Sequence, residues 1–174
     1  MASRPDYTIT EVAAWFAGRI PDGWFVEPVS VVADRDEIIV TGRLAAPSSA
    51  PDGEDAARMA AAARISGFRE DSRLHRMKIA EAAQLRWQRA VSWAASCDSV
   101  EMEFANASVP VMTRLRFADR QVLETLIDAG VARSRSEALA WCVSQVGEHQ
   151  SEWIDRLRDA MSEVERIRGE GPGA

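Results

Sequence analysis

A short alternating segment in the second half of the chain leaves few folds open to it. Over residues 111–117 apolar and basic side chains alternate with the two-residue period of a β-strand. The apolar face consists of Val111, Thr113, Leu115 and Phe117, and the opposite face of Met112, Arg114 and Arg116. A lone strand exposes both an unpaired backbone edge and its apolar face, so it is unstable without a partner. The segment must therefore pair with a hairpin of its own chain or with a second copy.

Two helices are predicted directly after this strand. Apolar residues recur at helical spacing over residues 118–129, and Gly130 supplies a left-handed stop. The second helix begins at Ser134, where Ser134 and Glu137 have the spacing of a capping box. Apolar positions then keep a 3-4-3-4 spacing as far as Gly169, which predicts one long C-terminal helix.

The stretch VPVMTRLRFADRQVLETLIDAGVARSRSEALAWCV, residues 109–143, resembles the ribbon-helix-helix family of DNA-binding proteins. The resemblance rests on the order and the lengths of the strand, the first helix, the GVARSRSEAL connection and the second helix. In that family two copies pair their strands into an antiparallel ribbon, and outward strand side chains enter the major groove of DNA. Here the unit is internal, and two candidate strands precede it that could extend the ribbon or block it.

The resemblance implies three sets of site residues. The residues that would contact base edges are Met112, Arg114 and Arg116. A DNA phosphate would be held at the start of the second helix by Arg133, Ser134, Arg135 and Ser136. The dimer core would consist of Val111, Thr113, Leu115, Phe117, Leu126, Leu139 and Cys142.

The first half of the chain predicts a separate α/β module, residues 1–108. Its expected elements are a helix capped by Thr8 or Thr10, a hairpin over 29–33 and 37–44, a helical region from Glu54 to Ala90, and a second hairpin over 91–96 and 100–105. The order is α-β-β-α-β-β, and Ser66-Gly67 is a possible break in the helical region. The predicted fold class is therefore α+β, with this module followed by a ribbon-helix-helix-like dimerisation unit, residues 109–174, and its long C-terminal helix.

Composition excludes several classes of function. Only Cys97, Cys142, His75 and His149 could supply soft metal ligands, and their spacing matches no metal or disulfide motif, so neither metal nor cofactor is expected. The sequence has no Walker loop, GxSxG or GxGxxG, so we do not expect an enzyme. The net charge of -6 argues against indiscriminate coating of nucleic acid, whereas residues 109–137 are a net-positive block whose basic side chains are all arginines.

Location and origin follow from similar observations. The start MASRPDYTIT lacks the apolar core of a signal peptide, and no stretch approaches the ~20 apolar residues that span a bilayer. We therefore expect a cytoplasmic protein without membrane contact, associated with the nucleoid if it binds DNA. All basic residues but Lys78 are arginines, which indicates a GC-rich genome and a bacterial source.

The expected function is sequence-specific binding of double-stranded DNA by a homodimer, in transcription regulation. Residues 1–108 would bind a small ligand or a protein partner, or hold dimers together. A second interpretation keeps the fold as a dimerisation scaffold for a protein or ribonucleoprotein partner, with Arg114 and Arg116 on a solvated face that pairs with the Glu101 and Glu103 strand. A further basic cluster, Arg73, His75, Arg76 and Lys78, is interpreted as a solvated helix face, with a second nucleic-acid patch as the alternative.

Overall fold

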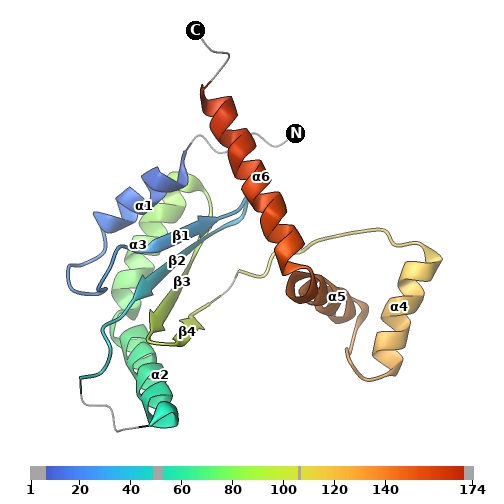
Figure 1. The fold of residues 1–174 in the computed structure, drawn as a ribbon, viewed down its shortest axis with the longest axis horizontal. Coiled ribbons are helices and arrows are strands. Elements are labelled where there is room, and N and C mark those ends of the chain that lie inside the picture. Colours follow the sequence, from blue (N-terminus) through green and yellow to red (C-terminus); the bar gives the residue numbers. More distant parts are fainter. Residues whose placement is uncertain (1–6, 49–52, 106, 171–174) are drawn as a thin grey trace. The chain divides into compact units, whose positions relative to one another are not determined.

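The computed structural model describes residues 7–48, 53–105 and 107–170. The chain divides into two compact units, Met1–Pro110 and Val111–Ala174, and each is described by itself (Figure 1). The protein is of the α+β class, with one mixed sheet and several helices.

The first unit is a four-stranded sheet packed against helices. Its described elements are α1 (Ile9–Ala17), β1 (Ser30–Ala33), β2 (Glu37–Arg43), α2 (Glu54–Asp71), α3 (Arg73–Trp87), β3 (Ala90–Cys97) and β4 (Val100–Glu103). The strand order is β1-β2-β3-β4; the two outer pairs are antiparallel and the central pair β2 and β3 is parallel. The helical crossover from β2 to β3 is what permits a parallel pair, because a tight turn joins only antiparallel strands.

The core of this unit forms where the helices meet the sheet. Figure 1 shows α1 and α3 across the same face of the strands. Ile38 and Val40 alternate inward along β2, and Phe16 of α1 lies edge-on to Trp93 of β3, with 5.8 Å between ring centroids. The first helix is capped by Thr8, whose hydroxyl accepts a hydrogen bond from the backbone N–H of Glu11.

The helical region over residues 54–90 differs from the prediction. It is two helices, so the order is α-β-β-α-α-β-β, and the break lies at Ser72. The Ser72 hydroxyl donates to the carbonyl of Phe68, and the guanidinium of Arg76 donates to the Ser72 Oγ at 2.9 Å and to the Arg69 carbonyl at 2.7 Å. The last carbonyls of α2 thus accept hydrogen bonds from the side chains of Ser72 and Arg76. Gly67 lowers the stability of the helix by only ~1 kcal/mol and does not interrupt it.

The second unit contains α4 (Phe117–Asp128), α5 (Arg135–His149) and α6 (Ser151–Glu170) among its described residues, and α4 packs on α5. Residues 111–116 form no strand in the single chain, contrary to the prediction. A strand requires a ladder partner, and the described part of one copy supplies none for this segment. We refer to residues 111–116 as the arm.

The predicted long C-terminal helix is interrupted at Gln150. This residue has φ -121° and ψ 23°, which ends α5, and α6 restarts at Ser151. The prediction passed over Gly147, a poor helix former in the last turn of α5, and Ser151, a residue type that favours helix starts. Gln150 therefore separates two helices.

Candidate nucleic-acid interface

The arm leads straight into α4, and two side chains fix that junction. Arg116 precedes the helix with an extended backbone, and its N–H donates to the carboxylate of Asp119 at 3.3 Å. The guanidinium of Arg120 reaches back to the carbonyl of Leu115 at 2.9 Å. The end of the arm is thus tied to the first turn of α4.

The three residues predicted to contact bases are all exposed on this arm. Met112 is 96 % exposed, and Arg114 and Arg116 are exposed as well. Within the described part of the chain neither arginine side chain forms an ion pair or a hydrogen bond. Their guanidinium groups therefore retain all the donors that a phosphate or a guanine edge can use.

The connection between α4 and α5 presents backbone donors. Gly130 turns the chain at φ +74°, and α5 begins after Ser134, whose Oγ accepts the Glu137 N–H at 3.2 Å. The predicted capping box is changed in its second half, because the Glu137 carboxylate accepts from the N–H of Arg133, at 2.8 Å, and not from that of Ser134. The first two amides of α5, on Arg135 and Ser136, have no acceptor among the described residues. A helix start of this kind attracts anions.

The two arginines at this helix start differ. The Arg135 guanidinium is paired with Glu124 of α4, with 2.7 Å between Nε and Oε1. The Arg135 side chain is 66% exposed and that of Glu124 is 44% exposed, so the pair contributes at most ~1 kcal/mol, and a phosphate could replace the carboxylate. Arg133 forms no side-chain pair within the described ranges. Of the predicted phosphate ligands, Arg133 is thus available and Arg135 must exchange a partner.

The predicted dimer core divides into two groups. Leu115, Leu126, Leu139 and Cys142 are half-buried and pack around a small core of Leu123, Ala132 and Ala138. The remaining members are exposed, with Val111 at 82 % and Phe117 at 67 % exposed. On the apolar face of the arm, Leu115 thus packs inward, whereas Val111 and Thr113 are exposed in the described part of one chain. A strand that pairs with a second copy of the chain would be exposed in this way in a single copy.

Apolar exposure continues along the two C-terminal helices. The large exposed side chains are Trp141, Val143, Val146, Trp153, Leu157, Met161, Val164 and Ile167. Soluble monomers rarely leave an apolar stripe of this extent in water. The 3-4-3-4 spacing of the sequence covers most of these positions, but Trp141 and Met161 were not singled out.

The basic cluster predicted on α3 does not act as one surface. Arg76 is buried, His75 packs against Trp24 with 6.1 Å between ring centroids, and Lys78 is exposed. Arg73 and Arg76 line a pocket together with Arg69 of α2, which the sequence analysis did not single out. Arg73 and Arg76 are three residues apart on α3, a spacing that places two side chains on one helical face, whereas Arg69 lies before the break at Ser72.

Two classes of site are not seen among the described residues. No three His, Cys, Asp or Glu side chains come together as metal ligands there. None of the helices in those ranges has both the length and the apolar character that crossing a membrane requires.

The fold and this interface define a two-unit α+β protein with an arginine-bearing arm ahead of three helices. Residues 10–103 match the family model described as Rv1265-like protein, N-terminal domain, and residues 116–168 match that of the Mb1296 C-terminal domain. The chain is 50% identical over 171 residues to Mb1296 of Mycobacterium bovis and to Rv1265 of Mycobacterium tuberculosis. Each alignment covers 98% of the chain and 74% of the relative. The chain therefore belongs to the Rv1265-like family.

These comparisons leave the partner of the interface open. The relatives are mycobacterial, which indicates a bacterial origin, and their names state neither an activity nor a ligand. Neither matched family is described as ribbon-helix-helix. No solved structure matches the chain significantly.

Proposed function

We propose that the protein is a homodimer that binds double-stranded DNA with sequence preference and regulates transcription in the bacterial cytoplasm, at the nucleoid. The observation that carries the proposal is the arm itself. Arg114 and Arg116 are exposed on a segment that is tied to α4 and followed by the start of α5, and neither these side chains nor the first two amides of α5 have a partner among the described residues. Base-reading and phosphate-holding groups are thus built into consecutive segments.

Dimerisation is supported by what the single chain leaves exposed. Antiparallel pairing of two arms would satisfy their backbone groups and cover Val111 and Phe117. The same symmetry would present Arg114 and Arg116 twice, side by side on the outer face of the ribbon. The preferred DNA site would then be a pseudo-palindrome.

The distribution of charge favours binding of DNA at one local site over nonspecific attraction to any polyanion. The whole chain carries a net charge of -6, so nonspecific affinity for a polyanion is weak. The arm and the start of α5 nevertheless concentrate arginines, whose planar fork suits guanine edges and phosphates. A protein of this kind binds DNA at one site and not over its whole surface.

The test is selection of preferred duplexes from a random pool, followed by affinity measurements on the preferred site and on random DNA at several salt concentrations. Arg114→Ala or Arg116→Ala should cost ~1 to 3 kcal/mol on the preferred site and shrink its advantage over random DNA. Arg133→Ala should weaken binding to both duplexes equally and reduce the salt dependence of the affinity by about one phosphate contact. Arg58→Ala, an exposed arginine of α2, serves as the matched control and should change neither.

A scaffold function is the second candidate, favoured by the apolar stripe on the acidic helix α6. It would replace the DNA proposal if the purified protein shows no preference among duplexes at moderate salt. It would also be favoured if removal of both arm arginines leaves the protein's cellular partners unchanged.

A further inference from the structure

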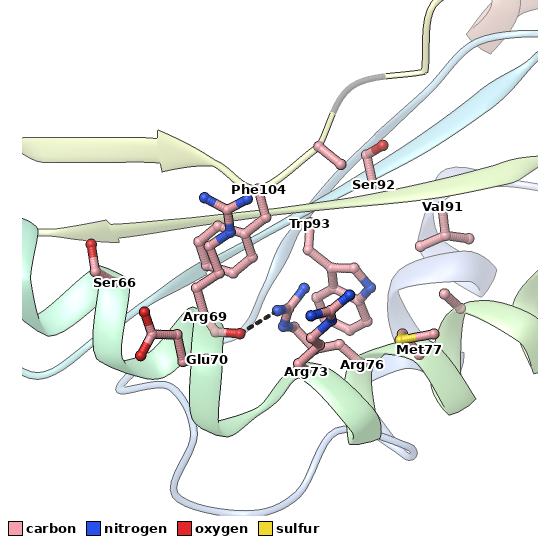
Figure 2. A pocket seen from close by; sticks show the side chains of 12 residues that line it. Ser66, Arg69, Glu70, Arg73, Arg76, Met77, Val91, Ser92, Trp93 and Phe104 are labelled. Atoms are coloured by element: carbon pink, nitrogen blue, oxygen red, sulfur yellow. Dashed lines mark hydrogen bonds between the residues drawn. The ribbon is translucent and has the colours of Figure 1, made fainter.

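We propose that the first unit binds a small organic anion, a phosphate or carboxylate on a flat apolar body, in a pocket between its helices and its sheet. The cavity has a volume of about 550 Å³, within the range typical of small-molecule sites. Figure 2 shows Arg69 of α2 and Arg73 and Arg76 of α3 directed toward the rings of Phe104 and Trp93. The proposal does not depend on DNA binding.

Three arginines line the pocket, and among the described residues none of them is paired with a carboxylate; Arg76 is buried, whereas Arg69 and Arg73 are exposed. Arg76 is only 8 % exposed, and none of the three guanidinium groups forms an ion pair within the described part of the chain. Burial, and then the charges of Arg69 and Arg73, lower the pKa of Arg76. Glu70 also lines the pocket, but Figure 2 shows its carboxylate turned away from Arg73 and Arg76. An unpaired buried charge is costly, so a bound anion would stabilise this arrangement.

A structural role for these arginines accounts for only part of the observation. Arg76 uses two of its five N–H donors to hold the junction between α2 and α3, on Ser72 and on the Arg69 carbonyl. That role explains the position of Arg76. It does not explain why the side chains of Arg69 and Arg73 are placed beside it, where like charges repel.

Aromatic side chains define the second part of the ligand. The Cζ of Arg76 lies 4.5 Å from the centroid of the Phe104 ring, and the Cζ of Arg69 lies 5.9 Å from the same centroid. Both guanidinium groups therefore form cation–π contacts with Phe104. Trp93 is 4 % exposed, lines the same pocket, and its Nε1–H has no acceptor among the described residues. With Met77 and Val91 these rings form apolar walls beside the cations. A flat apolar group attached to the anion would pack against these apolar walls.

The experiment is calorimetric titration of the full chain, without DNA, with four probes: phenyl phosphate, benzoate, inorganic phosphate and the neutral benzyl alcohol. Ionic strength is held constant. We expect phenyl phosphate or benzoate, whichever anion the site accepts, to bind at least about tenfold more tightly than benzyl alcohol and than inorganic phosphate. The comparison of the first two probes assigns phosphate or carboxylate.

Two charge-neutralising variants on the same helix locate the site. Arg73→Gln removes an exposed pocket cation that holds no helix junction, and should weaken the better probe at least about fivefold. Lys78→Gln removes one exposed positive charge that does not line the pocket, and should leave affinity unchanged. Thermal unfolding confirms that both variants are folded. Equal losses in the two variants, or no preference for the aromatic anions over benzyl alcohol, would overturn the proposal while leaving the DNA proposal intact.

Discussion

Gly42 lies on β2 at a point where any side chain would meet the ring of Phe25. A Cβ added there would be 2.2 Å from Cε1 of that ring, which is itself packed against Phe68 with 5.3 Å between centroids. We expect Gly42→Ala to lower the free energy of unfolding by ~1 to 3 kcal/mol, because ring or strand must move. Urea unfolding measures the change.

The matched control is Gly67→Ala within α2. No atom lies within 4 Å of the added Cβ, and the backbone is helical, so this variant should gain ~0.5 to 1 kcal/mol. Equal stability of Gly42→Ala and Gly67→Ala would show that the Phe25 ring does not pack closely on β2 at Gly42.

Cys97 is the second residue whose environment makes a clear prediction. It is fully buried at the end of β3, and burial, followed by the neighbouring charge of Asp98, raises the pKa of its thiol. The reactive thiolate is therefore both inaccessible and disfavoured. Iodoacetamide at mildly alkaline pH should modify Cys97 only after unfolding, as followed by mass spectrometry. Labelling of native protein as fast as in urea would contradict this.

Among the elements, α5 depends on a single cap that can be removed cleanly. Ser134→Ala deletes the acceptor of the Glu137 N–H and should destabilise the second unit by ~1 kcal/mol. Ser136→Ala changes the same residue type two positions later, where the side chain forms no hydrogen bond in the described structure. Thermal unfolding without DNA should separate the two variants. Equal stability would mean that the cap contributes nothing.

The elements also show how far the sequence alone can be taken. The bounds of β1 and β2 were predicted within one or two residues because runs of β-branched residues are local signals, and those of β3 and β4 were predicted as closely although each contains only one such residue. The break between α2 and α3 at Ser72 was not predicted, because it depends on hydrogen bonds that the Arg76 side chain donates to residues one to two turns earlier in the sequence. The same holds for the pocket: Arg73 and Arg76 were visible as a basic cluster, but the burial of Arg76 and the pocket that both residues line depend on packing against β3 and the residue after β4. The cap at Ser134 was predictable, and the shift of the Glu137 carboxylate to Arg133 was not.

The whole molecule combines one unit with a large core and one without. The first unit has a continuous core that includes Phe16, Ile38, Ile65 and Trp93. Among the described residues of the second unit, the buried core consists only of Leu123, Ala132 and Ala138. A core of this size cannot offset the conformational entropy of a folded unit. The second unit should therefore need a second copy, whereas the first should fold by itself.

This difference predicts two unfolding transitions with different concentration dependence. Over a roughly hundredfold range of protein concentration, the transition of the second unit should rise in temperature and that of the first should stay constant. Val111→Glu, at an apolar-face position that is 82 % exposed in one chain, should abolish the rise and give a monomer in sedimentation, because a carboxylate would enter the paired apolar face of the arm. Met112→Glu places the same charge on the opposite face and should leave the dimer intact. An unmutated protein that stays monomeric and fully folded at low micromolar concentration would show that the arm pairs with nothing.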